Sequence, residues 1–209
     1  MSSSSAKTNI LNKIKQALET PTPLPFPKAE GVENFIQPLQ QDLVIEFAEQ
    51  FTKLQGKFIF CADRAELHEQ FNKLCLQNQW TKLYCVEDEW RAELQQSQWH
   101  NDIGSSEIAI TGCEVLVART GSIVLSSAAN RRVPSVYAPI HICIAYSTQL
   151  IYDIKEALEF IKNKYQNGLP SLISFATGPS RTADIEKTLV VGVHGPKEVY
   201  CFLVDSPVE

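Results

Sequence analysis

The sequence predicts an α/β protein built on a parallel β-sheet with helices on its faces, preceded by an N-terminal helical arm. Three observations support this expectation. Helical and strand-like stretches alternate between residues 35 and 98, an order typical of strand–helix–strand units. After residue 101 the chain changes to short runs rich in Val and Ile, which indicate further strands. The 209 residues, 44% of them hydrophobic and 21% charged, are enough for one domain with a sizeable core.

The first stretch of the chain is predicted to be a helical arm that is separate from the main domain. Residues 6–19 carry apolar side chains at helical spacing, at Ile10, Leu11, Ile14, Ala17 and Leu18. Four prolines between residues 21 and 27 then favour an extended connector. We therefore divide the chain into an arm, residues 1–28, and a main domain, residues 29–209. The apolar face of the arm could pack on its own domain or reach a second subunit, which leaves a homo-oligomer open.

In the first half of the main domain, helices and strands are expected to alternate. Gly56 should end the first helix, and Asp63 should cap the second, with Glu66 three residues later completing a pattern like a capping box. The predicted elements are a helix over residues 35–54, a strand over 57–61, a helix over 64–77, a strand over 82–86 and a helix over 87–98.

The second half is expected to contain short strands and one long helix. Thr120 and Gly121 read as a tight turn between two of the strands. The later helix should turn Ile154, Leu158 and Ile161 inward. The predicted elements are strands over 107–110, 114–118, 122–126 and 141–146, a loop over 128–139, and a helix over 154–165 that Asn167 and Gly168 close.

The stretch from residue 171 to residue 205 is predicted to be strand, loop, helix start, loop and strand. Gly178 and Pro179 should end an apolar strand over 172–176, because Gly relaxes the backbone and Pro lacks a donor. Either Ser180 or Thr182 could cap a short helix that begins at Ala183. A second turn over 192–196 then leads into a strand over 198–204.

Composition and the N-terminal sequence argue against several classes of protein. The net charge of −5 provides no general attraction for nucleic acid, and the one tight basic pair, Arg131 and Arg132, has no interleaved aromatic residues. No apolar run approaches the roughly 20 residues that span a bilayer. Residues 1–19 lack the apolar core of a secretory signal. We therefore expect a cytoplasmic protein without a membrane span.

The cysteines and histidines offer no frame for a metal ion or a cluster. No two cysteines are close enough for a CxxC motif, and the four histidines form no HxxxH or HxH pair. His141 opens an apolar strand and is more simply a structural histidine. We expect no cofactor and no metal in this chain. The six cysteines lie mostly in strand-like runs, as small core residues, at Cys61, Cys75, Cys85, Cys113, Cys143 and Cys201.

Polar residues gather in three predicted loops, where they could form a site for a small anion. Ligands of open α/β sheets lie outside the carboxyl ends of the strands, and loop N–H groups with an Arg guanidinium can hold a carboxylate or a phosphate. The candidate residues are Arg119, Thr120, Gly121, Ser122, Thr177, Gly178, Ser180, Arg181, Thr182 and His194.

Each of these residues also has a structural interpretation. Residues 120–121 could simply form a hairpin turn. Arg181 could make a salt bridge with Asp184 or Glu186, and His194 could fix its loop through a hydrogen bond. No nucleophile with an obvious partner stands out, so catalytic residues and enzymatic activity stay open.

The amino-acid sequences of two stretches resemble those of the LUD domain family, which includes the lactate-utilisation protein C subunits. The first stretch contains TGPSRTADIEK, then GVHGP, and then a strand that ends in LVD. The second contains TGCEVLVARTGSIVLSS, followed after a loop by PIHICIA. The resemblance covers roughly residues 100–205. It implies a Rossmann-like open sheet of the NagB/RpiA/CoA-transferase group. The chain departs from the family pattern at Arg119, where members commonly carry Glu, and over residues 128–139, where they commonly have a Gly-rich loop.

The resemblance implies a function in L-lactate oxidation. In that family the protein C subunit is paired with iron–sulfur partner proteins, and lactate is converted to pyruvate. This chain would be the subunit without clusters, and it would bind a small anionic ligand. Two alternatives stay open, namely a stand-alone enzyme of the NagB/RpiA/CoA-transferase group and a non-catalytic binding or regulatory module.

Overall fold

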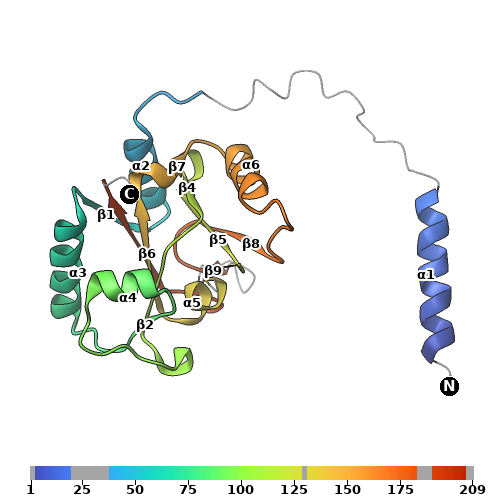
Figure 1. The fold of residues 1–209 in the computed structure, drawn as a ribbon, viewed down its shortest axis with the longest axis horizontal. Coiled ribbons are helices and arrows are strands. Elements are labelled where there is room, and N and C mark those ends of the chain that lie inside the picture. Colours follow the sequence, from blue (N-terminus) through green and yellow to red (C-terminus); the bar gives the residue numbers. More distant parts are fainter. Residues whose placement is uncertain (1–2, 20–37, 129–130, 183–189, 206–209) are drawn as a thin grey trace. The chain divides into compact units, whose positions relative to one another are not determined.

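The computed structural model describes residues 3–19, 38–128, 131–182 and 190–205 (Figure 1). The chain divides into two compact units, residues 1–38 and residues 39–209. The first unit contains α1 (Ser3–Glu19), a helix where the sequence predicts one, with the apolar side chains of Ile10, Leu11, Ile14 and Leu18 exposed. The predicted connector over 21–27 lies outside the described residues. No helix in the described part of the chain is long and apolar enough to cross a membrane.

A five-stranded parallel sheet forms the centre of the second unit. Its strand order is β1-β11-β6-β3-β2, and every neighbouring pair is parallel. The predicted α/β fold class with a parallel sheet is therefore confirmed. The last strand lies between the first strand and β6, so distant parts of the sequence meet at the middle of the sheet. The strands are β1 (Lys57–Cys61), β2 (Leu83–Cys85), β3 (Ile108–Thr111), β6 (Ile140–Tyr146) and β11 (Glu198–Val204).

A second, four-stranded sheet takes up most of the short strands after residue 112. Its order is β7-β4-β5-β8, with antiparallel pairing of β5 to β4 and to β8 and parallel pairing of β4 to β7. Two further short strands, β9 (Arg181–Thr182) and β10 (Val190–Val191), pair with each other. The strands of the second sheet are β4 (Val115–Val117), β5 (Ser122–Ser126), β7 (Leu150–Ile151) and β8 (Ile173–Ala176).

Alternate residues of the central strands point to opposite faces of the parallel sheet, and each face has its own core. Ile142 and Ile144 of β6 pack under α3 and α4, whereas Cys143 and Ala145 pack under α2 and the second sheet. Helix α6 covers the outer face of the second sheet, as Figure 1 shows. The main helices are α2 (Leu43–Lys53), α3 (Arg64–Asn78), α4 (Asp88–Leu94), α5 (Arg132–Tyr137) and α6 (Ile154–Lys164).

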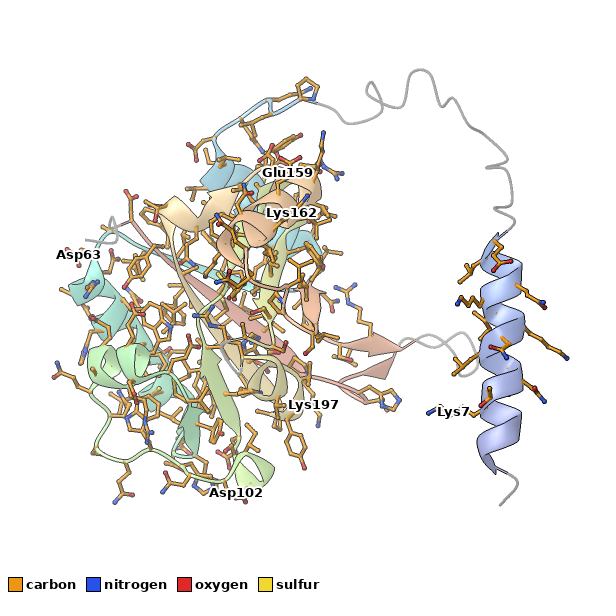
Figure 2. The ribbon with its side chains drawn as sticks, turned by 45° about the vertical axis from the view of Figure 1, so that its right-hand side comes forward. Lys7, Asp63, Asp102, Glu159, Lys162 and Lys197 are labelled. Atoms are coloured by element: carbon orange, nitrogen blue, oxygen red, sulfur yellow. The ribbon has the colours of Figure 1, made fainter. Side chains whose placement is uncertain are left out.

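Local signals at the helix ends explain which boundaries agree with the prediction. Asp63 accepts a hydrogen bond of 2.8 Å from the Glu66 N–H, as predicted for the cap of α3. The Glu66 carboxylate reaches back to the N–H of Ala62 at 2.7 Å, one residue before the expected position. In Figure 2 Asp63 stands at the start of this helix. In the described part of the chain, three short 3-10 turns link other elements, namely η2 (Ile103–Ser105), η3 (Ala118–Thr120) and η4 (Ser147–Gln149).

Two predicted helices are too long. The helix expected over 35–54 begins only at Leu43, because the Asp42 side chain accepts from the Val44 N–H at 2.8 Å and caps it there. Residues 35–37 lie outside the described part of the chain. At the other end, Gln55 rather than Gly56 takes the left-handed conformation, with a φ of 67°. The helix expected over 87–98 ends at Leu94.

Three other expectations need correction or lie beyond the described residues. The predicted loop over 128–139 contains the short helix α5. Leu158 of α6 is not inward but 46% exposed, and Ala157 takes the buried position instead. Thr182 belongs to strand β9 and not to a helix cap. The helix predicted from Ala183 lies outside the described residues.

Candidate functional site

The loop after β4 and the loop after β8 lie next to each other, because β5 and β8 are paired. Ile123 of β5 is opposite Ala176 of β8, so the residues at the strand ends come together. The Ser122 hydroxyl is 2.9 Å from the Thr177 hydroxyl and 2.7 Å from the Thr120 hydroxyl. Three of the predicted site residues therefore form one hydroxyl cluster (Thr120, Ser122 and Thr177), in which the groups bond to one another.

Two predicted glycines hold these loops against the end of α2. Gly121 has a φ of 59°, and a Cβ there would overlap with the backbone nitrogen of Phe51. Gly178 has a φ of 83°, and a Cβ there would overlap with the carbonyl oxygen of Leu54. A side chain at either position would therefore meet both backbone strain and a backbone clash. The role of both glycines in the structure is close packing on α2.

Both predicted arginines have partners inside the protein. Arg119 donates from Nε to the Asp153 carboxylate, which also caps α6 by accepting from the Lys155 N–H at 2.9 Å. Burial opposes the charge of Asp153, but the Lys155 N–H and Arg119 outweigh it and lower the pKa of this carboxyl. Arg181 donates to the Leu54 carbonyl oxygen. A glutamate at position 119 would face Asp153 as a like charge, so arginine suits this site.

The remaining candidates belong to the region around β9 and β10. The Ser180 N–H donates to the Pro196 carbonyl at 2.9 Å, and the Gly192 N–H donates to the Ser180 carbonyl at 2.9 Å. His194 is exposed in the turn after β10, and no hydrogen bond in the described part of the chain joins it to the hydroxyl cluster. The structure therefore brings together the residues of the first two loops, whereas no hydrogen bond between described residues links His194 to them.

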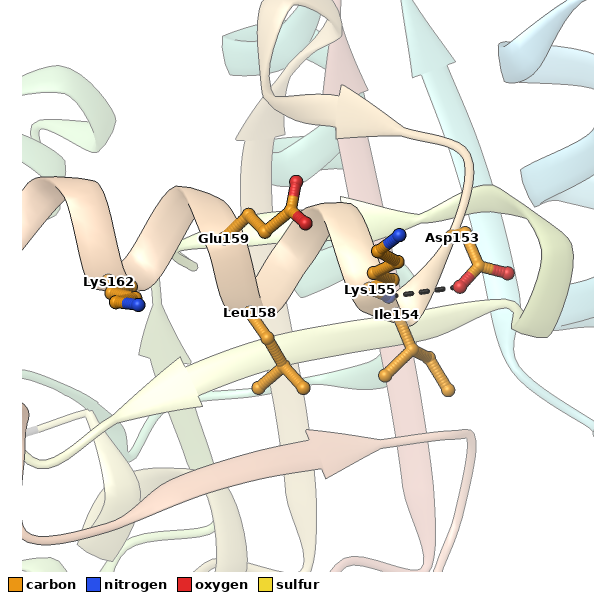
Figure 3. Close-up of a pocket in the computed structure, with 6 residues that line it drawn as sticks. All are labelled: Asp153, Ile154, Lys155, Leu158, Glu159 and Lys162. Carbon is orange, nitrogen blue, oxygen red and sulfur yellow. Dashed lines mark hydrogen bonds between the residues drawn. The ribbon is translucent and has the colours of Figure 1, made fainter. Parts of the chain in front are cut away.

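An open hollow lies along α6, beside the Arg119–Asp153 pair. It has a volume of about 440 Å³. Figure 3 shows Ile154 and Leu158 pointing to the same side of the helix, with Asp153 bonded to the backbone of Lys155. Its floor is apolar and its rim is charged. The lining residues are Asp153, Ile154, Lys155, Leu158, Glu159 and Lys162.

A buried charge cluster around Glu114 was not predicted from the sequence. The side chain of Glu114 is fully buried at the start of β4, and Lys164 of α6 donates to it at 2.7 Å. Ser126 and Tyr165 donate to the other carboxylate oxygen at 2.7 and 3.0 Å, and Arg131 lies 3.5 Å from it. Burial alone would raise the pKa of Glu114, but the hydrogen bonds from Lys164 and Ser126 outweigh it and lower the pKa.

Arg131 links this cluster to the ends of β2 and β3. Its Nε and Nη2 lie 2.8 and 2.7 Å from one Glu87 oxygen, and its Nη1 donates to the Cys113 carbonyl at 3.0 Å. The other Glu87 oxygen accepts from the Gly112 N–H at 2.7 Å. The guanidinium thus fixes the segment between β3 and β4, where the chain passes from the first sheet to the second.

The sequence carries only a weak signal for this cluster. Glu114 stands at the start of an apolar run, and an acid that enters a core needs a partner. Its partners, however, come from segments far away in the sequence, at Arg131 and Lys164. Spacing alone could not pair them. In the sequence, Arg131 stands out only as half of the basic pair Arg131–Arg132.

The thiol groups lie in the interior of the protein. All six cysteines are free and buried. Burial raises the pKa of Cys61 to about 12, of Cys75 to about 11 and of Cys85 to about 12. Metal ligation needs the thiolate, which this environment disfavours. Among the described residues, no three His, Cys, Asp or Glu side chains are grouped so that they could hold a metal ion.

Comparison with known proteins gives a consistent result. A family model described as the LUD domain matches residues 77–204. The chain is 30% identical over 161 residues to lactate utilization protein C of Bacillus subtilis, covering 76% of this chain and 67% of that protein. It is 32% identical over 107 residues to lactate utilization protein C of Deinococcus radiodurans, covering 50% of each. The chain spans about half the length of the first curated relatives that it matches.

A solved structure supports the fold. The crystal structure of a DUF162 family protein from Deinococcus radiodurans superposes with a TM-score of 0.60 at 20% sequence identity. The match covers 80% of this chain and 99% of that chain. At this identity the likeness establishes the arrangement of helices and strands.

Proposed function

Because this chain belongs to the LUD domain family, we propose that it serves lactate utilisation in the cytoplasm, as a subunit without clusters of its own. It would act with iron–sulfur partner proteins that oxidise L-lactate to pyruvate. The observation that carries this proposal is the family match over residues 77–204, together with relatives named lactate utilization protein C. The match extends from the end of α3 to the last strand, so it includes most of both sheets.

The burial of the cysteines supports the proposal that the partner proteins, and not this chain, carry the iron–sulfur clusters. An iron–sulfur cluster needs several thiolates close together. Here the thiols are buried in the core, and burial raises the pKa of Cys61, Cys75 and Cys85. This supports our proposal that the electron-carrying clusters belong to the partner proteins.

We further propose that a small anion binds at the loops of the hydroxyl cluster, as the sequence predicts. Ser122 and Thr177 would supply the donors. Arg119 would have to share its guanidinium between the anion and Asp153. The matched test replaces Ser122 and Thr177 by Ala and compares this variant with Ser127→Ala/Ser171→Ala. The control pair lies at the opposite end of β5 and β8, with its hydroxyl oxygens 3.0 Å apart. Weaker binding of phosphate in the first variant alone supports the location.

Disruption of the gene in its own organism tests the role in lactate utilisation. We expect loss of growth on L-lactate as the carbon source, normal growth on pyruvate, and rescue by the wild-type gene. Normal growth on L-lactate after disruption would contradict the proposal. It would then favour a stand-alone enzyme of the same fold group, or a binding module.

A further inference from the structure

A small pocket lies at the carboxyl ends of three neighbouring strands of the parallel sheet. Gly112 follows β3, Tyr146 ends β6, and Trp90 belongs to the helix that follows β2. Arg131 and Lys164 complete the wall of this carboxyl-end pocket. Its volume is about 210 Å³. This is below the roughly 300–1,000 Å³ typical of sites for drug-sized ligands, so the pocket suits a small metabolite.

The indole N–H of Trp90 is a buried donor in this pocket. It has no hydrogen-bond partner in the described part of the chain. Trp90 is 3% exposed, and its ring centre lies 5.6 Å from that of Tyr146. Buried indole N–H groups usually find an acceptor, because an unpaired buried donor costs free energy. An acceptor atom on a bound molecule would satisfy this group.

Gly112 allows three polar atoms to gather on one side of the pocket. A Cβ at this position would lie 2.9 Å from Trp90 Nε1, 3.2 Å from a Glu87 oxygen and 3.4 Å from Arg131 Nη2. The two nitrogens are donors and the carboxylate oxygen is an acceptor. A hydroxyl group matches this set, because it can accept from an N–H and donate to the carboxylate. A ligand carboxylate at the same place would meet Glu87 as a like charge.

The charges around the pocket argue against a ligand with two negative charges. Arg131 is paired with Glu87 and Lys164 with Glu114, so the two cations are already balanced. Glu89 at the rim adds a further negative charge. A dianion would therefore find no net attraction. The Lys164 side chain is 44% exposed, and its ammonium group has three donors, so it can hold Glu114 and one ligand carboxylate together.

We propose that the carboxyl-end pocket binds a small 2-hydroxy monocarboxylate, with its hydroxyl near Gly112 and its carboxylate toward Lys164. The rings of Trp90 and Tyr146 offer an apolar wall to its alkyl part. L-Lactate is the member of this class that the proposed function supplies, so the choice of this ligand rests on that function. Pyruvate carries a carbonyl in place of the hydroxyl and cannot donate to Glu87. It should therefore bind more weakly than L-lactate.

Calorimetric titration of the full chain with L-lactate, pyruvate and succinate tests the ligand class. L-Lactate should bind, pyruvate should bind several-fold more weakly, and the dianion succinate should not bind. Trp90→Phe keeps an aromatic ring but removes the N–H, so it should weaken L-lactate binding about tenfold. This corresponds to a loss of about 1.4 kcal/mol in binding free energy. Trp99→Phe is the control, because Trp99 does not line the pocket.

A second pair of variants tests the carboxylate end of the pocket. Lys164→Gln should weaken L-lactate binding about tenfold or more, because it removes a charged donor. Lys162→Gln is the matched control, because Lys162 lies on the same helix but lines the hollow of Figure 3. The proposal is overturned if the wild type does not bind L-lactate at millimolar concentration. It is also overturned if both pocket variants bind as the wild type does.

Fluorescence gives a readout that does not depend on the stability of a pocket variant. The chain has three tryptophans, and the variant Trp80→Phe/Trp99→Phe leaves Trp90 as the single reporter. Its emission must change when L-lactate is added, and an unchanged emission contradicts the pocket. The growth test separates this inference from the proposed function. Loss of growth on L-lactate without binding by the purified chain would refute the pocket alone, and binding without a growth defect would refute the function alone.

Discussion

Replacement of Glu114 by Gln should lower the free energy of unfolding by about 2–3 kcal/mol at pH 7. The Glu114 side chain is fully buried, and Lys164 Nζ lies 2.7 Å from its carboxylate. Loss of one partner from a buried ion pair costs about 3–5 kcal/mol when the other charge stays buried. Here the Lys164 side chain is 44% exposed and can turn to water, and the amide keeps one oxygen acceptor. The expected loss therefore lies below that range.

The deficit of the Gln variant should also shrink in acid. The net effect of the Glu114 surroundings is a pKa below the usual range, because the hydrogen bonds from Lys164 and Ser126 outweigh burial. A carboxyl group with a lowered folded-state pKa stabilises the protein fully above its unfolded pKa of about 4.3. This contribution is lost as the pH falls through the folded-state value. The Gln side chain does not titrate, so the two proteins should converge below about pH 4.

Urea unfolding at pH 7 and at a series of lower pH values measures both effects. Glu107→Gln is the control, because Glu107 forms only an exposed pair with Lys82 at 3.6 Å. Such pairs contribute about 0–1 kcal/mol. If Glu114→Gln is no less stable than Glu107→Gln at pH 7, or if its deficit is constant down to pH 3, the account of this cluster is wrong.

Three further predictions concern stability and can be measured by the same unfolding assay. Gly121→Ala should destabilise by more than the ~1–2 kcal/mol of left-handed strain, because its Cβ would also overlap with the backbone of Phe51. Gly168→Ala should show the backbone strain without the clash, because a Cβ at that position meets nothing within 4 Å. An equal loss of stability in Gly121→Ala and Gly168→Ala would contradict this reasoning. Phe51→Ala should cost about 3–5 kcal/mol, against about 0.5 kcal/mol or less for Leu76→Ala, since Phe51 is fully buried and Leu76 is 79% exposed. Burial lowers the pKa of His141 to about 4, so the unfolded state, with a pKa of about 6.5, binds the proton more readily. The free energy of unfolding should then fall by up to about 3 kcal/mol as the pH drops from about 6.5 to 4. If a His141→Gln variant shows the same dependence of stability on pH, this explanation is wrong.

Strand prediction succeeded where an apolar run ends at a clear turn signal. The predicted bounds 57–61 and 122–126 are those of β1 and β5. Helix prediction failed where an apolar repeat continues beyond the cap. The four-residue repeat before Leu43 looks helical, but the Asp42 side chain bonds to the Val44 N–H and sets the start of α2. Periodicity reports which side chains are apolar, whereas a cap is decided by one side-chain bond to the backbone.

The division into two sheets could not be predicted, and the candidate site depends on it. Strands of both sheets are short runs rich in Val and Ile, and pairing depends on partners far away in the sequence. Ser122 and Thr177 were both predicted as site residues, but their contact follows from the pairing of β5 with β8. The charges around Glu114 were missed for the same reason, since Arg131 and Lys164 come from other segments.

The position of β11 has a consequence for synthesis on the ribosome. The central sheet stays open along the edges of β1 and β6 until residues 198–204 have left the exit tunnel, because β11 is the strand that joins them. Unpaired strand edges invite association with other chains, and a parallel pairing across the whole domain forms slowly. The nascent chain is therefore most exposed to aggregation just before residues 198–204 emerge. A premature stop codon upstream of Glu198 would leave β1 as a single unpaired strand and β6-β3-β2 as a three-stranded sheet with an open edge.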